Sequence, residues 1–158
     1  MNPLSIVTDN IAELLVKIIE FTQIRQKILN RNVHGLKNPG FVPKDLPVQE
    51  FCDLLNCAVA EHIQRRRLLM RDTDNIRFGE NGSMEVTPAV DEFAKALLQR
   101  NQDEYLELQI DKLLENSLNQ KLAAELLRQK QGRIPIFEKL AIKKGKKGKI
   151  QLEDVSIE

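Results

Sequence analysis

The sequence has few aromatic residues and no tryptophan. Aromatic residues account for 4% of the 158 residues, whereas hydrophobic residues account for 42% and charged residues for 30%. Leu, Ile, Lys, Glu and Gln are abundant instead, which favours helices that bury narrow apolar stripes over a thick globular core. A chain of this length is sufficient for one modest domain. We therefore expect one domain of elongated helices.

An excess of one charge is also missing. The formal net charge is +1, whereas nucleic-acid-binding and membrane-surface proteins usually show a clear basic excess. The sequence contains no run of about 18 apolar residues, and its first ten residues, MNPLSIVTDN, lack the basic and apolar regions of a cleavable signal peptide. We expect no nucleic-acid partner, no integral membrane segment and no secretion through a cleaved signal.

Residue patterns typical of catalysis and metal binding are absent. There is no glycine-rich phosphate loop after a predicted strand, no nucleophile elbow and no HExxH motif. The cysteines Cys52 and Cys57 lie on one predicted helix at a spacing that points them to different sides, so they form no disulfide or metal framework. We interpret them as buried or free thiols. We expect no enzyme activity, no cofactor and no metal site.

A few residues could still be assigned a chemical role. The arginine run 65–67 could bind phosphate and His62 could transfer a proton, but a solvated helix face and a half-buried histidine explain both. Acidic pairs such as Asp91 with Glu92 fall on the predicted polar side of a helix, where solubility is a sufficient role.

The first predicted helix spans residues 8–33, with Thr8 or Asp9 as its cap. Its apolar residues recur at steps of three and four and form a heptad seam. Two polar residues, Arg25 and Asn32, also fall on the seam, where such residues usually set the helix register or meet a partner from another chain. A single helix cannot bury this seam alone. The apolar seam residues are Ile11, Leu14, Ile18, Phe21 and Ile28.

The expected partner is a C-terminal helix over residues 87–131, which begins with Thr87 as cap and Pro88 as first helical residue. Its apolar residues move around the helix, so one flat contact cannot cover them all. The helix is therefore expected to break near Asn116–Asn119 or to contact different neighbours along its length. The apolar residues are Val90, Phe93, Leu97, Tyr105, Leu106, Leu108, Ile110, Leu113, Leu114, Leu118, Leu122 and Leu126.

Residues 34–86 contain a predicted shorter helix from Val48 to about Met70, followed by a loop or short hairpin. After Gly132, glycines interrupt a run of lysines and an acidic end follows, a composition typical of a flexible tail. We expect a helical domain over residues 1–134 and a tail over residues 135–158, solvated and not a binding patch.

The stretch RNVHGLKNPGFVPKD ends the first predicted helix in an unusual way. Pro39 disfavours helix at Asn38, and Gly40 permits positive φ, so the chain should leave the helices in an extended direction. Phe41 and Val42 then either contact a neighbouring subunit or pack back on their own helix.

This stretch resembles the N-terminal motif of the bacterial flagellar basal-body rod family, most closely its proximal rod members. In that family a long first helix ends in Asn-Asn-Ile-Ala-Asn and then Thr-Pro-Gly-Tyr. A second stretch, MEVTPAVDEFAKALLQRN, resembles the motif before the family's C-terminal helix, and the resemblance covers residues 8–45 and 82–105. The matching positions are Asn32, Val33, Pro39, Gly40, Phe41, Lys44, Asp45, Met84, Glu85, Val86, Val90, Phe93 and Ala94.

The chain departs from the family pattern at several places. Asn38 stands where the family has Thr, Ala89 stands where it usually has Glu, and the C-terminal helix continues about fifty residues beyond the usual end. Other departures are Arg31, His34 and Gly35.

The resemblance implies an all-α fold, an elongated helical hairpin or coiled coil of long N- and C-terminal helices with a shorter middle helix and loop. It implies a structural subunit of the proximal rod, made in the cytoplasm and exported to the basal body without a cleaved signal. The implied partners are other rod proteins, the MS ring, the export gate and copies of itself. The expected subunit interface comprises Ile11, Leu14, Ile18, Phe21, Ile28, Asn32, Pro39, Gly40, Phe41, Val42, Val90, Phe93 and Leu97.

One alternative accounts for the same helices without a flagellar role. The chain could be a soluble helical adaptor or chaperone-like binding protein. An adaptor should remain a defined monomer or dimer at rising concentration, whereas an axial subunit should assemble further.

Overall fold

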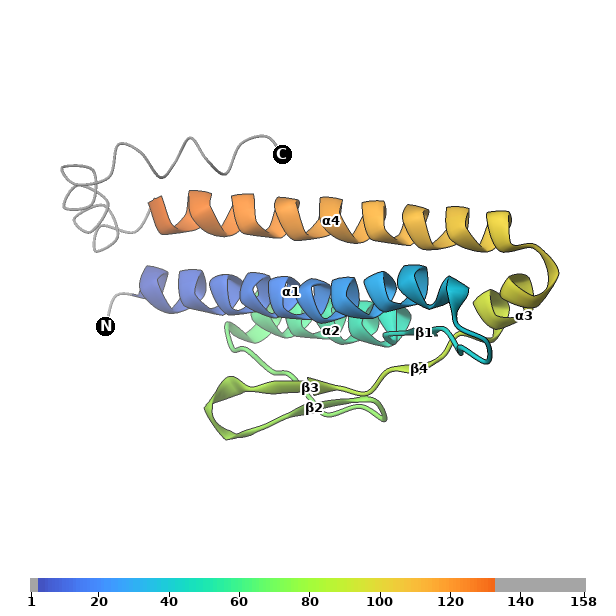
Figure 1. The fold of residues 1–158 in the computed structure, drawn as a ribbon. Coiled ribbons are helices and arrows are strands. Elements are labelled where there is room, and N and C mark those ends of the chain that lie inside the picture. The colour runs from blue at the N-terminus through green and yellow to red at the C-terminus, as the bar shows by residue number, and fades with distance from the viewer. Residues whose placement is uncertain (1–2, 133–158) are drawn as a thin grey trace.

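In the computed structural model, the described residues run from 3 to 132, and side chains are described from 10 to 131. This part of the chain is mostly helical, as predicted, with two short strand pairs. The helices are α1 (Pro3–His34), α2 (Val48–Arg65), α3 (Glu92–Arg100) and α4 (Gln102–Gly132). Figure 1 shows the two long helices, α1 and α4, side by side, with α2 and the hairpin of β2 (Ile76–Phe78) and β3 (Met84–Val86) on the other side of α1.

The predicted pairing of the first helix with the C-terminal segment is confirmed, because α4 runs back along α1 as its most extensive neighbour (Figure 1). The predicted start of the first helix is wrong. Helix α1 begins at Pro3, so Thr8 and Asp9 lie inside it and do not cap it. Proline is compatible with the first helical turn, where its missing N–H would be unpaired in any case. Knobs-into-holes packing of a coiled coil stays a prediction.

The predicted C-terminal helix is wrong in its start and in its break. Thr87 and Pro88 precede a strand, and Asp91 caps α3 by accepting a hydrogen bond from the backbone N of Ala94 at 3.0 Å. The break falls at Asn101, whose backbone is extended and whose Oδ1 accepts from the first free amides of α4. Short polar side chains that bond these amides compete with helix continuation, which explains both positions. Asn116 lies within α4.

The middle helix is shorter than predicted. Helix α2 ends at Arg65 because Arg66 adopts the left-handed conformation with φ 55°, so the predicted continuation to Met70 is wrong. The hairpin alternative is confirmed: β2 (Ile76–Phe78) pairs antiparallel with β3 (Met84–Val86). A one-turn 3₁₀ helix, η2 (Glu80–Gly82), connects the two strands.

The expected extended exit after α1 is also confirmed. A one-turn 3₁₀ helix, η1 (Gly35–Lys37), is followed by extended Asn38 and by Gly40 at φ +78°. The chain then forms β1 (Lys44–Asp45), which pairs antiparallel with β4 (Ala89–Val90). This strand pair joins the segment after α1 to the segment before α3.

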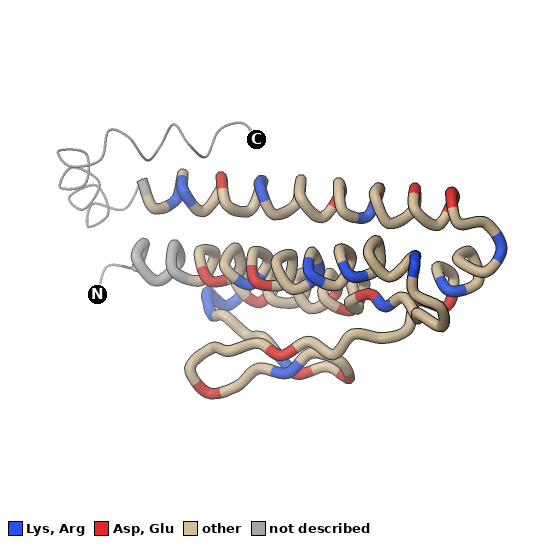
Figure 2. Tube along the Cα trace, in the orientation of Figure 1, with Lys and Arg blue, Asp and Glu red and all other residues tan. Residues whose placement is uncertain are grey.

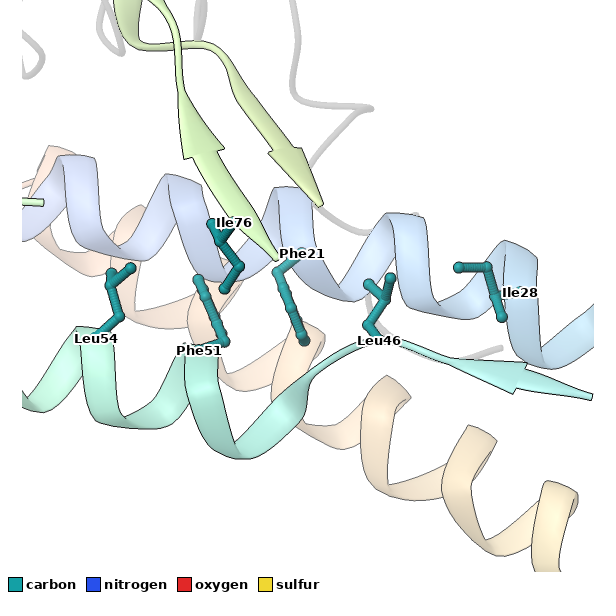
Figure 3. Packing of buried hydrophobic residues seen from close by; sticks show 6 residues of the cluster. All are labelled: Phe21, Ile28, Leu46, Phe51, Leu54 and Ile76. Atoms are coloured by element: carbon teal, nitrogen blue, oxygen red, sulfur yellow. The ribbon is translucent and has the colours of Figure 1, made fainter. Parts of the chain in front are cut away.

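The main core lies between α1, α2 and the hairpin. The rings of Phe21 and Phe51 stack with their centroids 4.0 Å apart, and Ile76 of β2 lies near them (Figure 3). Leu46, Leu54 and Ile28 complete this buried cluster. A second, smaller cluster of Ala94, Leu97 and Tyr105 joins α3 to α4.

Candidate functional site

Most of the seam residues predicted at a subunit interface lie inside the chain's own packing. Leu14, Phe21, Ile28, Asn32 and Leu97 are buried. In this chain these side chains are part of its own packing, and a role for them at a subunit interface stays a prediction. The partly buried seam residues are Ile11 and Ile18.

The remaining predicted interface residues are mostly exposed. Phe93 is 65% exposed, Val90 40% and Val42 38%, and Pro39 and Gly40 are also exposed. These residues lie in or beside the strand pair β1–β4 and the start of α3, so they occupy one end of the molecule (Figure 1).

Phe41 packs back on its own chain. A Cβ placed on Gly35 would lie 2.5 Å from three ring carbons of Phe41, far closer than any tolerated contact. The ring therefore covers the backbone of η1, and only glycine leaves room for it at position 35. Of the two alternatives for this segment, the structure shows the intrachain packing for Phe41.

Four charged residues from four segments form a cluster beside the strand pair β1–β4 and the start of α3. Arg25 of α1 donates two hydrogen bonds to the Asp45 carboxylate, from Nε at 2.9 Å and from Nη2 at 3.1 Å. Lys112 of α4 donates to Asp45 at 3.0 Å and to Asp91 at 2.6 Å. The sequence left open whether Arg25 meets another chain, and its partner here is Asp45 of the same chain. The cluster joins α1, β1, the cap of α3 and α4.

The charges of the cluster reinforce one another. Burial alone would raise the pKa of Asp45, but the hydrogen bonds and charges of Arg25 and Lys112 hold it below its ordinary value. Burial alone would lower the pKa of Lys112, but Asp91 and Asp45 outweigh it and raise that pKa. The folded chain therefore favours the ionised form of both residues.

Polar side chains also join α1 to α4 directly. Asn32 Nδ2 donates to Gln109 Oε1 at 3.0 Å and to the Lys44 carbonyl at 2.7 Å. The Tyr105 hydroxyl donates to the Asn32 carbonyl at 2.8 Å, and burial raises the pKa of Tyr105 to about 12. Such directional bonds are satisfied in one register only, so Asn32 acts as a register residue within the chain. Further along, Asn116 Nδ2 donates to the Thr22 carbonyl at 2.7 Å.

A row of exposed apolar side chains lies on α4. Five branched aliphatic side chains recur every four residues, and each is between 42% and 60% exposed. Because four residues exceed one helical turn, this exposed row winds obliquely over the helix surface. These residues belong to the shifting stripe of the predicted C-terminal helix, which was expected to contact different neighbours along its length, and their constant spacing is visible in the sequence. The exposed row comprises Ile110, Leu114, Leu118, Leu122 and Leu126.

The far end of the exposed row reaches a groove between α1, α2 and α4, with a volume of about 260 Å³. Leu15, Ile18 and Phe21 lie on its α1 side, and Leu122 and Leu126 on its α4 side. The α2 side consists of Val48, Phe51, Cys52 and Leu55.

A second cavity lies on the other side of α2, with a volume of about 480 Å³. Cys57 lines this cavity and Cys52 lines the groove, as expected for thiols on different sides of one helix. Both thiols are free and exposed. The cavity's carboxylates are engaged within the chain, because Glu50 binds Asn75 and Glu61 binds Arg67 at 2.9 Å.

His62 is buried, not half-buried as expected, and its Nδ1 lies 3.4 Å from Nδ2 of Asn10.

No group of three potential metal ligands occurs in the described part of the chain. Charges of both signs are spread over the helices (Figure 2). None of the helices described is long and apolar enough to cross a membrane.

Comparisons with known proteins give no match: no family model, curated protein or solved structure is significantly similar to this chain.

Proposed function

We propose that this chain is a structural subunit of the flagellar basal-body rod type that acts by assembling with other axial subunits. The observation that carries the proposal is the exposed row on α4, from Ile110 to Leu126. Contiguous exposed apolar surface of this kind marks an interaction site in most soluble proteins. An assembling subunit would bury the row against a neighbour.

The rod identity rests on the two sequence motifs, and their arrangement supports it. The turn motif ends in Lys44 and Asp45, and the second motif includes Ala89 and Val90. These segments pair as β1 and β4, with Lys44 opposite Val90. Two stretches that resemble one family are thus in contact at the end of the molecule where α1 and α4 meet α3. Under this proposal the partners are other rod proteins, the MS ring, the export gate and further copies of the chain.

Assembly in solution tests the exposed row. We would compare the wild-type chain with a Leu114→Glu/Leu118→Glu variant by light scattering over a range of concentrations. The wild type should grow in mass with concentration and the variant should remain monomeric, because a buried unpaired carboxylate opposes association. Ala124→Glu adds a charge at an exposed position of α4 outside the row and should assemble like the wild type. Equal masses for wild type and double variant at all concentrations would contradict the role of the row.

The flagellar assignment has its own test. A tagged chain, expressed in the source bacterium in place of the native copy, should co-purify with detergent-extracted basal bodies, and deletion should abolish motility. Normal motility after deletion, with no basal-body component in the purified fraction, would reject the assignment. A helical adaptor would instead form a complex of fixed stoichiometry whose mass does not rise with concentration.

A further inference from the structure

The first half of α4 exposes apolar and acidic side chains together. Ile110 is 51% exposed and Leu114 is 59% exposed. Three exposed carboxylates follow the same four-residue spacing, so they form an acidic row beside the apolar one. Every exposed charged residue between positions 101 and 120 is acidic, because Lys112 is half-buried and bound to two carboxylates of its own chain. We call this the acidic surface, and it comprises Glu107, Ile110, Asp111, Leu114 and Glu115.

The last turns of α2 expose apolar and basic side chains together. Val59 is 43% exposed and Ile63 is 65% exposed, and exposed arginines follow at the end of the helix and just beyond it. We call this the arginine surface, and it comprises Val59, Ile63, Arg65, Arg66, Arg67 and Arg71.

One carboxylate, Glu61, lies among these arginines. It binds Arg67 at 2.9 Å and Arg65 at 3.5 Å. The hydrogen bond from Arg67 and the charges of Arg65 and Arg71 hold the pKa of Glu61 below its ordinary value, so several arginines share this carboxylate. Its single negative charge leaves an excess of positive charge on the arginine surface.

The two surfaces lie apart on the molecule. Figure 2 shows acidic positions along the start of α4 and basic positions at the end of α2 that lies away from α3. The near edge of the acidic surface lies beside Thr22, because Asn116 donates to the Thr22 carbonyl. The arginine surface lies beside Asn10, whose Nδ2 donates to the Arg66 carbonyl at 3.4 Å.

This separation keeps the surfaces from meeting within one chain. The step from residue 10 to residue 22 measures about 18 Å along a helix, and α2 and α4 also lie on different sides of α1 (Figure 1). Contact between the two surfaces therefore requires two copies of the chain.

We propose that the acidic surface of one copy binds the arginine surface of a second copy. The exposed aliphatic side chains of the two surfaces pack together, and the carboxylates meet the arginines. Exposed ion pairs contribute little affinity but select partner and orientation, so the apolar contact supplies most of the binding. The inference rests on the proposed function, because it takes assembly through the α4 row as given and names the surface that the first part of the row meets.

The opposite charges favour this contact over a symmetric one. A symmetric dimer through α4 alone places carboxylates against carboxylates, and one through the end of α2 places arginines against arginines, so both arrangements are repulsive. A contact between two different surfaces leaves one surface of each kind free in every pair. Further copies can then add until a ring closes, and without closure the assembly stays open.

Charge reversal tests the contact in the full-length chain. One variant, Asp111→Lys/Glu115→Lys, reverses the acidic surface, and another, Arg65→Glu/Arg71→Glu, reverses the arginine surface. Each variant alone brings like charges together, so the concentration at which it associates, measured by light scattering, should rise by about tenfold or more. Mixed in equal amounts, the two variants restore opposite charges at both contacts and should associate like the wild type.

A matched control changes the net charge by the same amount elsewhere. Lys27→Glu/Lys37→Glu adds negative charge at exposed positions outside both surfaces and should associate like the wild type. Wild-type association of either reversed variant would overturn the proposal, and so would equal loss of association in the control. A mixture of the reversed variants that stays monomeric would also overturn it, because the arginine surface would then serve another partner, such as an anionic ligand.

The same measurements separate this proposal from the proposed function. If the wild type associates and the Leu114→Glu/Leu118→Glu variant does not, while both charge reversals associate normally, the α4 row is an interface and the arginine surface is not its partner. A wild type that stays monomeric at all concentrations would contradict both.

Cross-linking between differently labelled copies tests the pairing of the surfaces. In a Cys52→Ser/Cys57→Ser background, one chain carries Ile63→Cys and another carries Leu114→Cys. A short bismaleimide should link the two chains when they are mixed and should link neither chain to itself. Linked dimers of a single variant, or the same low yield in all three samples, would overturn the proposal.

Discussion

The two ends of the α1–α4 pair are held together by different interactions. At the end near α3, the polar end, Asn32, Gln109 and Tyr105 form directional hydrogen bonds, and the Asp45 cluster lies beside them. At the other end, which we call the apolar end, Leu14, Leu15 and Ala123 are buried. In the described part of the chain, the polar contact between α1 and α4 that lies nearest to this end is the hydrogen bond from Asn116 to the Thr22 carbonyl.

The two ends of the α1–α4 pair have different consequences for the fold. Buried hydrogen bonds and ion pairs are costly unless each partner is in place, so the polar end selects one register of α1 against α4. Apolar contacts are not directional, and the apolar end leaves Leu118, Leu122 and Leu126 exposed. The polar end thus specifies the fold, and the apolar end retains surface for a further segment or subunit.

The largest expected effect comes from breaking the polar end at Asp45. Asp45→Ala leaves Arg25 and Lys112 without their shared carboxylate, which should lower the free energy of unfolding by about 3–5 kcal/mol. Urea unfolding followed by circular dichroism measures the change. Asp53→Ala, which removes an exposed carboxylate on α2, should change stability by less than about 0.5 kcal/mol. Equal stabilities of the two variants would show that the cluster does not hold this end together.

A smaller effect is expected at the turn beside the polar end. Gly35→Ala places a methyl group against the ring of Phe41 and should destabilise the chain by about 1–3 kcal/mol. The same change in a Phe41→Ala background should cost much less, because the obstructing ring is gone. A double-mutant cycle measures this coupling. Additive effects would indicate that Phe41 does not pack on Gly35 in solution.

The pH dependence of stability should also originate at the polar end. Because the folded pKa of Asp45 is lowered, its contribution is present above its unfolded pKa of about 3.9 and is lost as pH falls through the folded value. The pKa of Lys112 is raised and that of Tyr105 is raised to about 12, so their contributions are present below pH about 10 and are lost above it. Urea unfolding from pH 3 to 11 should show a plateau between two declines. Asp45→Asn should reduce the acid decline, and an unaltered acid decline would assign it to other carboxyl groups.

The smallest effect on stability is expected at the apolar end. Leu118→Gln replaces a side chain that is 60% exposed and should change the free energy of unfolding by less than about 0.5 kcal/mol. The same urea measurement, made at a concentration where the chain is monomeric, tests this. A loss above about 2 kcal/mol would mean that something in the monomer already covers Leu118.

Local patterns in the sequence were sufficient for the existence of the main helices. The three-and-four spacing of Leu14, Ile18 and Phe21 identified α1 and its buried side, and Pro39 with Gly40 identified the turn. The start of α3 and the break at Asn101 were not predicted. The side chains of Asp91 and Asn101 accept hydrogen bonds from the first amides of α3 and α4, but in the sequence Thr87 followed by Pro88 is a competing signal for the start of a helix. The sequence contains both candidate caps, Thr87 and Asp91. Because Ala89 and Val90 pair with β1 as strand β4, the helix can begin only after them, at Asp91.

The sequence by itself determined that this chain is mostly helical, that its first helix has one apolar side and that its C-terminal segment has apolar residues on more than one side. These properties follow from residue spacing along a regular helix. Only the tertiary structure decided which side of each helix is covered. It placed Arg25, Asp45, Asp91 and Lys112 in one cluster and left the row from Ile110 to Leu126 exposed. The reason is physical: burial depends on which distant segments meet, and residues 25, 45, 91 and 112 come together only after α4 has folded back along α1.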